Sequence, residues 1–71
     1  MKRDNVFSST LKSMGYEGNV LEIEFKTGRV YQYKDVPFEV FQQLRIAPSI
    51  GKDFNEIIVR GGFEYKRVDI L

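Results

Sequence analysis

The chain has 71 residues with 11 basic and 10 acidic side chains, and its formal net charge of +1 excludes nucleic-acid binding by global charge, so only a local basic patch remains. It contains neither Cys nor His, so no disulfide or thiolate site forms and a zinc site would have carboxylate ligands only. No apolar run approaches the roughly 18 residues of a membrane span, and we expect one cytoplasmic domain over residues 1–71 that needs no cofactor and contacts no membrane.

The first predicted strand lies within residues 6–16, "VFSSTLKSMGY", where small polar side chains interrupt the apolar ones. Because the alternation is imperfect, we expect an irregular or edge strand that begins near Ser9 or Thr10. The hydroxyls of Ser8, Ser9 and Ser13 are expected to bond the backbone where this strand bends.

Residues 20–26 and 29–34 predict a β-hairpin, because apolar and charged side chains alternate with a period of two. The two faces of the first strand carry apolar Leu21, Ile23 and Phe25 against charged Glu22, Glu24 and Lys26. A three-residue loop over 26–28, with Gly28 at positive φ, puts every large apolar group on one face. It pairs Phe25 with Arg29, Ile23 with Tyr31 and Leu21 with Tyr33. A two-residue loop would slip the register and mix the faces, so burial selects the longer loop.

A first short helix is predicted after the hairpin. Pro37 suits a first helical turn, with Asp35 or Val36 as the cap. Pro48 ends this helix, because the residue before a proline avoids the helical conformation. The apolar stripe of the helix carries Val40, Phe41 and Leu44.

A second short helix is predicted to begin with Ser49 as its N-cap and to end at Gly61-Gly62. Its apolar face carries Ile50, Phe54, Ile57 and Ile58. The tail over residues 63–71 alternates again and forms either a short fourth strand or an extended segment on the body. The predicted fold is therefore α+β: a three-stranded antiparallel β-meander followed by two short helices packed on one face, with a short C-terminal extended segment.

Four stretches of the chain, taken in order, resemble the KTSC domain family: "SSTLKSMGY", "LEIEFKTGRVYQYKDVP", "VFQQL" and "SIGKDFNEIIVRGGFEYKRV". The matching positions are Ser9, Ser13, Gly15, Tyr16, Leu21, Ile23, Phe25, Gly28, Tyr31, Tyr33, Val36, Pro37, Ser49, Gly51, Phe54 and Asn55. That family occurs at the C-terminal end of lysyl-tRNA synthetases and as small stand-alone proteins of bacteria and phages. The resemblance therefore implies an RNA-related role by association and no particular activity. This chain departs from the family pattern at the turn over 17–19, which is shorter than usual.

Two interpretations exist for Tyr31 and Tyr33. Their rings can form a platform on which single-stranded bases stack, or they can pack beneath the helices with only their hydroxyls reaching polar partners. They share a predicted face with Leu21, Ile23 and Phe25, and amphipathic helices need such a face to cover. The core interpretation is therefore favoured.

A local basic patch is the leading functional hypothesis. The second helix and the tail carry the candidate nucleic-acid-binding residues Lys52, Asn55, Arg60, Tyr65, Lys66 and Arg67. They predict a non-enzymatic module that binds RNA or another nucleic acid weakly, with the basic groups on phosphate and the tyrosine stacked on a base. Asp53 and Glu56 lie among them and weaken the field, so the alternative is a solvated charged face.

A protein-interaction or homodimerisation module is the rival hypothesis. The first or last strand would then offer an open edge to a partner strand. Phe38, Ile46 or Ile70 would serve as exposed apolar anchors.

We expect no enzyme. A hydrolase would need a serine beside an activated lysine, because the chain has no His or Cys to act as base. Glu22 and Glu24 are expected to be solvated charges near Lys34 and Lys26, because so small a domain offers little cleft for paired catalytic carboxylates.

Overall fold

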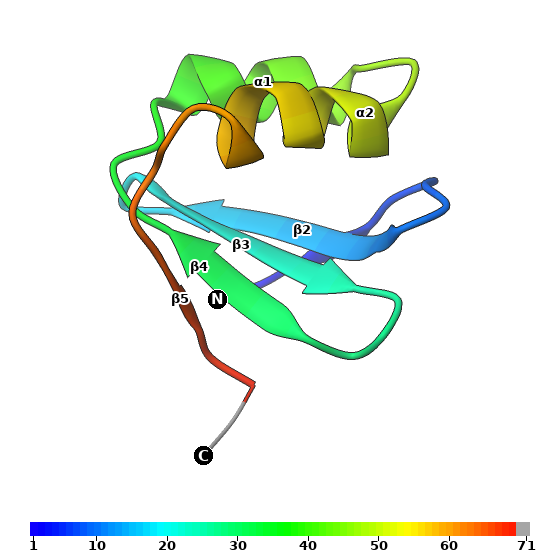
Figure 1. Ribbon diagram of the computed structural model, residues 1–71, viewed down its shortest axis with the longest axis horizontal. Helices are drawn as coiled ribbons and strands as arrows, with labels where there is room; N and C mark the ends of the chain where they lie inside the picture. Colours follow the sequence, from blue (N-terminus) through cyan, green and yellow to red (C-terminus); the bar gives the residue numbers. More distant parts are fainter. Residues whose placement is uncertain (70–71) are drawn as a thin grey trace.

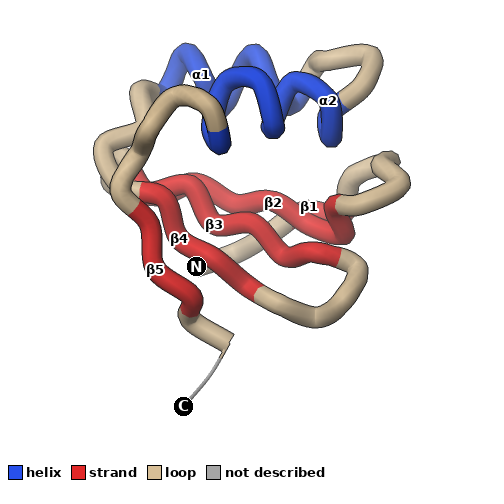
Figure 2. Tube along the Cα trace, in the orientation of Figure 1, coloured by secondary structure: helices blue, strands red, loops and turns tan. Residues whose placement is uncertain are grey.

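The computed structural model describes residues 1–69, which form an antiparallel five-stranded sheet with helices packed on one face (Figures 1 and 2). The strands lie side by side in chain order, and the helices connect β4 to β5. The elements are β1 Asp4–Asn5, β2 Leu11–Glu17, β3 Val20–Phe25, β4 Val30–Tyr33, α1 Phe38–Arg45, α2 Ile50–Phe54, the π-helix η1 Asn55–Val59, and β5 Tyr65–Arg67. No helix within these residues is long and apolar enough to cross a bilayer.

The sheet has five strands where three were predicted, because two short edge strands extend the central meander. β1 pairs with β2 through residues 4 and 5, so β2 is an interior strand and not an edge. Its register shifts between Leu11 and Ser13, which confirms the predicted irregularity, and it begins at Leu11, one residue after the predicted start. At the other edge β5 pairs with β4, which confirms the tail as a strand. Segments of two and three residues are too short to show a periodicity, so only their pairing reveals them.

The predicted register of the β3–β4 hairpin is confirmed. Leu21 pairs with Tyr33 and Ile23 with Tyr31. The turn closes through two 2.9 Å hydrogen bonds, in which the Phe25 N–H donates to the Arg29 carbonyl and the Gly28 N–H to the Phe25 carbonyl. Gly28 has φ of +96°, a conformation in which a side chain would be strained. Burial of one face and the freedom of one glycine therefore set the register.

The core lies between the sheet and the helices, as predicted. Its completely buried side chains come from both layers: Leu11, Leu21, Ile23, Val36, Leu44 and Ile58. Tyr33 belongs to the same cluster with 6% of its surface exposed, whereas Tyr31 is only partly buried against it. The core interpretation of the two tyrosines is thus confirmed for Tyr33, while Tyr31 lies at the margin.

The start of α1 differs by one residue from the prediction. The helix begins at Phe38, and Pro37 holds the N-cap position with extended backbone, φ −63° and ψ 147°. Asp35 is no cap, since it has φ of +57° and lies before the extended segment. The α1 N-terminus thus has no side-chain cap.

The second predicted helix consists of two segments, α2 and η1. Ser49 holds the N-cap position of α2 without a side-chain hydrogen bond to the helix. The backbone then widens into a π-helix, and the Arg60 N–H donates to the Asn55 carbonyl at 3.2 Å. The chain leaves η1 at Gly61, where a Cβ would collide with the Ile57 carbonyl oxygen, and at Gly62, which has φ of +74°. The predicted stop at these glycines is therefore confirmed, but the π-helix was not foreseen.

Candidate functional site

A cleft of about 730 Å³ opens between the sheet and the η1 segment. Its floor is made by side chains of β3, β4 and β5, and its roof by η1 and the glycine turn that follows. The loop before β2 and the β3–β4 turn line its remaining wall. The lining residues are Ser9, Thr10, Phe25, Lys26, Thr27, Arg29, Tyr31, Tyr33, Ile58, Val59, Gly62, Phe63 and Tyr65.

The floor of the cleft is a continuous aromatic surface. Phe25 and Tyr31 meet edge to face with ring centroids 5.8 Å apart. Tyr65 lies 5.8 Å from Tyr31 and 5.5 Å from Tyr33, again between centroids. Since Tyr65 is 60% exposed, it presents an open ring beside the half-buried ring of Tyr31. At the cleft margin the ring of Tyr31 thus lies beside the exposed ring of Tyr65, while Tyr33 is buried. The base-stacking platform stays a prediction.

Tyr33 is the most buried of the aromatic side chains that line the cleft. Burial, together with smaller contributions from the neighbouring Tyr31 and Tyr65 phenols, raises the pKa of Tyr33 to about 12. The phenol therefore stays protonated at neutral pH and acts as a hydrogen-bond donor. Among residues 1–69 it donates to no protein acceptor.

Two cations at the β3–β4 turn give the cleft a positive rim. Lys26 and Arg29 flank Gly28, and within the described part of the chain neither forms an ion pair or a side-chain hydrogen bond. None of the lining residues is acidic. The Asp69 carboxylate lies next to this rim, on the Val30 N–H, but it is paired with Arg67. An anion at the rim would therefore meet a net positive charge from Lys26 and Arg29. Sequence reasoning missed both residues, although they lie directly beside Phe25 and Tyr31 on either side of the turn.

The six predicted site residues do not form one patch. Lys52 and Asn55 are exposed on the helical layer, and Arg60 follows η1 with its guanidinium 4.0 Å from the Glu56 carboxylate. Val59, which precedes Arg60, lines the roof of the cleft. Arg60 thus lies near the cleft, whereas Lys52 and Asn55 do not line it.

The three predicted residues of β5 are divided between the two faces of the sheet. Tyr65 pairs with Tyr33 and Arg67 with Tyr31, so both lie on the helix side, because residues paired directly across strands share a face. Lys66 pairs with Gln32 on the opposite side. The structure therefore brings Tyr65 into the cleft, places Arg67 beside it and separates Lys66 from both.

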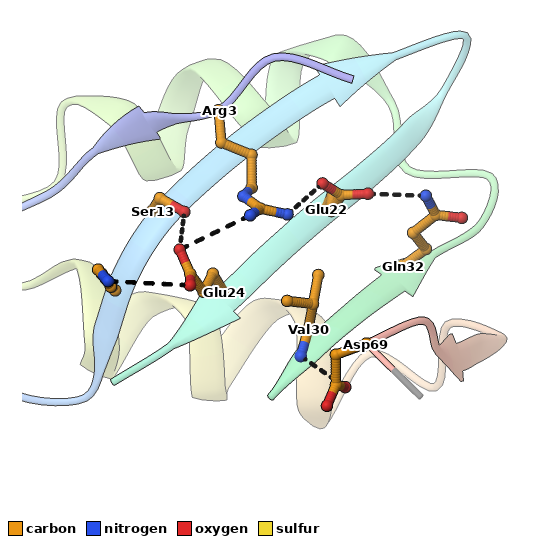
Figure 3. A network of polar contacts seen from close by, with 8 residues as sticks. Arg3, Ser13, Glu22, Glu24, Val30, Gln32 and Asp69 are labelled. Carbon is orange, nitrogen blue, oxygen red and sulfur yellow. Dashed lines mark hydrogen bonds and ion pairs between the residues drawn. The ribbon is translucent and has the colours of Figure 1, made fainter. Parts of the chain in front are cut away.

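Asp69 holds the end of β5 against β4. Its carboxylate accepts the Val30 N–H at 2.9 Å (Figure 3) and two hydrogen bonds from Arg67 at 2.8 and 3.0 Å. The Arg67 hydrogen bond, followed by that from Val30, holds the pKa of Asp69 well below its usual range, and the same pair raises the pKa of Arg67. Arg67 is thus engaged within the protein, and its pairing fixes the strand that carries Tyr65.

The opposite face of the sheet carries a buried polar network, where solvated charges near Lys34 and Lys26 were predicted. Glu22 is only 7% exposed; Arg3 donates to one of its oxygens at 2.5 Å and Gln32 to the other at 2.8 Å (Figure 3). Glu24 accepts from Ser13 at 2.9 Å and lies 3.7 Å from the Arg3 guanidinium. The prediction was wrong because the N-terminal residues cover this face, with the Lys2 carbonyl against Gly15.

The serine hydroxyls near the start of β2 have different roles from each other. Ser8 accepts from the Thr10 and Leu11 N–H groups, both at 3.2 Å, which is the backbone bonding that was predicted. Ser13 instead donates to the Glu24 side chain. The expectation that the chain is not an enzyme stays a prediction.

The sequence pattern of the KTSC domain matches residues 7–63. This range contains β2, β3, β4 and the whole helical layer, while β1 and β5 lie outside it. An uncharacterized protein of Stutzerimonas stutzeri is 44% identical over 71 residues, covering 97% of this chain and all of that protein. The crystal structure of a KTSC domain protein from Yersinia pestis superposes with a TM-score of 0.87 at 36% identity, over 94% of this chain and 96% of the other.

A third relative is much longer than this chain. A lysine–tRNA ligase of Nostoc punctiforme is 40% identical over 62 residues, which cover 84% of this chain but 11% of the ligase. Two further cyanobacterial lysine–tRNA ligases match over the same length. With the family pattern spanning most of the described fold and the crystal structure sharing it, the chain belongs to the KTSC domain family.

Proposed function

We propose that this chain is a non-enzymatic module that binds single-stranded RNA in the aromatic cleft. The observation that supports this most is the composition of the cleft: five aromatic rings, two basic side chains without partners among residues 1–69, and no acidic side chain. Stacking on aromatic rings and attraction of the phosphate backbone are the two elements of single-strand recognition. The proposal keeps the RNA hypothesis but moves its centre from the second helix to the cleft.

Each part of the cleft has a definite task in this proposal. Tyr65 and Tyr31 offer open ring surface for a base, a contact worth about 1–3 kcal/mol per base. Lys26 and Arg29 bind the adjoining phosphates at the rim. Arg60, next to the roof residue Val59, is a further phosphate contact along the path of the strand.

The relatives support an RNA-related role by association. A segment similar to this chain is part of proteins named lysine–tRNA ligases. It makes up 11% of each ligase. An accessory contact with RNA is compatible with so small an added domain.

The proposal is tested by fluorescence anisotropy with a labelled single-stranded octauridylate. We expect binding at low salt that is lost when Lys26 and Arg29 are both replaced by glutamate. With three phosphate contacts, from Lys26, Arg29 and Arg60, affinity should fall about eighteenfold between about 50 and about 200 mM salt. Tyr65→Ala should weaken binding at least about fivefold through the lost stacking.

Lys66→Glu is the matched control, because Lys66 is also an exposed β5 cation but lies on the opposite face of the sheet. It should leave the affinity within about twofold of wild type, a change of about 0.4 kcal/mol. Absence of binding at low salt, or an equal loss in Lys66→Glu, would refute the cleft as the RNA site.

A protein interface is the second candidate, favoured by exposed apolar side chains away from the cleft. Ile46 is 82% exposed, Phe38 is 50% exposed, and Phe7 is fully exposed. The third anchor named from the sequence, Ile70, lies outside the described residues. Light scattering over a concentration series tests it: a dimer that Ile46→Lys dissociates would support this function.

A further inference from the structure

The cleft contains one polar group that the fold does not use, the hydroxyl of the largely buried Tyr33 side chain. Tyr33 is 6% exposed, and its ring packs against Phe54 and Tyr65 at centroid distances of 5.6 and 5.5 Å. Its hydroxyl makes no hydrogen bond with any of residues 1–69. Within the same residues, no side-chain nitrogen or oxygen is both fully enclosed and without a partner. The hydroxyl oxygen must therefore be reached from the cleft that the residue lines.

This hydroxyl is free to bond a molecule that enters the cleft. A hydroxyl on a largely buried side chain keeps its hydrogen bonding only where water or a ligand reaches it. A phenylalanine would provide the same packing against Phe54 without needing such a partner. Since the pKa of about 12 keeps the proton on the oxygen, the group offers a donor to whatever enters the cleft.

The surroundings of this donor restrict what can reach it. Tyr31 and Tyr65 bound the floor next to it, and Ile58 and Val59 form the roof above. Such apolar walls accept a flat, weakly polar group and exclude a hydrated phosphate or a charged side chain. Among the described lining residues, the cations are Lys26 and Arg29, at the rim on the β3–β4 turn. A ligand that matches the cleft therefore has a flat ring that carries a hydrogen-bond acceptor in its plane, linked to an anionic group that stays at the rim.

We infer that one base of the bound RNA strand enters this cleft edge first and accepts a hydrogen bond from the Tyr33 hydroxyl, which makes Tyr33 the residue that detects a base. The inference rests on the proposed function and adds to it a mode of recognition. A cleft of about 730 Å³ lies in the usual range for sites that hold one small ligand, roughly 300–1,000 Å³, so it takes a single nucleotide rather than a run of bases. The flanking phosphates then lie at Lys26 and Arg29.

Tyr33→Phe tests the inference, because it removes the hydroxyl and keeps the ring. Anisotropy titrations compare octauridylate, whose bases carry carbonyl acceptors, with an octamer of abasic ribose phosphates of the same charge. In the variant the affinity for octauridylate should fall about three- to tenfold, the range of one hydrogen bond. Its affinity for the abasic octamer should not change. An octamer with one uridine among abasic positions should reproduce most of the difference.

Tyr16→Phe is the control for the loss of a phenol elsewhere. The Tyr16 hydroxyl donates to the Val36 carbonyl at 2.6 Å, away from the cleft, so this variant should bind both octamers like wild type. Circular dichroism at the assay temperature verifies that each variant is folded.

The possible outcomes separate the inference from the proposed function. If wild type binds octauridylate and Tyr33→Phe binds it equally well, the inference is refuted while RNA binding stands. An equal loss for both octamers also refutes it, because the hydroxyl would then not act on a base. If wild type binds neither octamer, the proposed function fails and the inference with it.

Discussion

Replacing Arg3 by alanine should destabilise the folded chain by about 2 kcal/mol. The Arg3 guanidinium reaches one oxygen of Glu22 at 2.5 Å, and its side chain is 28% exposed while that of Glu22 is 9% exposed. Breaking a fully buried pair costs about 3–5 kcal/mol, whereas an exposed pair contributes about 0–1 kcal/mol. This pair is intermediate, and Glu22 keeps one hydrogen bond from Gln32 at 2.8 Å, so we take about 2 kcal/mol.

Thermal unfolding followed by circular dichroism measures this effect. For a domain of this size, 1 kcal/mol corresponds to about 4–8 °C in Tm, so Arg3→Ala should lower Tm by about 8–16 °C. Lys2→Ala removes a neighbouring cation that is exposed and should change stability by less than about 0.5 kcal/mol. In a double-mutant cycle, Arg3→Ala should cost much less when Glu22 is already glutamine, because no charge is then left unpaired. Wild-type stability of Arg3→Ala would show that the network does not hold the N-terminal strand.

Two further predictions concern the β3–β4 turn and the attachment of β5 to β4. Gly28→Ala should lower the free energy of unfolding, measured in urea, by about 1–2 kcal/mol, because Gly28 has φ of +96°. The control Thr27→Ala, in the same turn, should change it by less than about 0.5 kcal/mol. Equal effects of the two variants would contradict the role of Gly28 in the turn. Asp69→Asn should lower stability near neutral pH, because hydrogen bonds from Arg67 and Val30 depress the pKa of Asp69 in the folded state. A carboxyl group whose pKa is lower in the folded state stabilises that state fully at pH values above its unfolded pKa of about 3.9. This contribution to stability is lost as the pH falls toward the lowered pKa of the folded state. The gap in Tm between wild type and variant should therefore be constant from neutral pH to about pH 5 and narrow below about pH 4; a gap that does not change in acid would refute the pairing.

The cleft depends on residues both inside and outside the part of the chain that matches the family. Tyr31, Tyr33 and the two rim cations lie within residues 7–63, but Tyr65 belongs to β5 beyond them. Asp69 and Arg67 hold that strand in place. The exposed Tyr65 ring, on which a base would stack, is therefore supplied by β5, the strand that the contacts of Asp69 and Arg67 hold against β4.

Features that depend on neighbours in the chain could be predicted from the sequence. The alternation over residues 20–34, together with one glycine, was sufficient for the register of the β3–β4 hairpin. Pro48 and Gly61-Gly62 marked the ends of the helices, and the apolar spacing identified the face that they bury. These properties follow from backbone sterics and side-chain period, which act over a few residues.

Features that depend on distant segments were decided by the tertiary structure alone. Glu22 had the spacing of a solvated side chain, yet it is buried because Arg3, 19 residues earlier, lies over that face. The hairpin pattern placed Lys26 and Arg29 at the turn, but their position at the rim of a cleft depends on η1, which covers the neighbouring rings. Local sequence thus determined which side chains of a strand or helix share a face. Which segments cover those faces, and hence which polar groups are removed from water, was determined by packing between segments far apart in the chain, which no sequence periodicity connects.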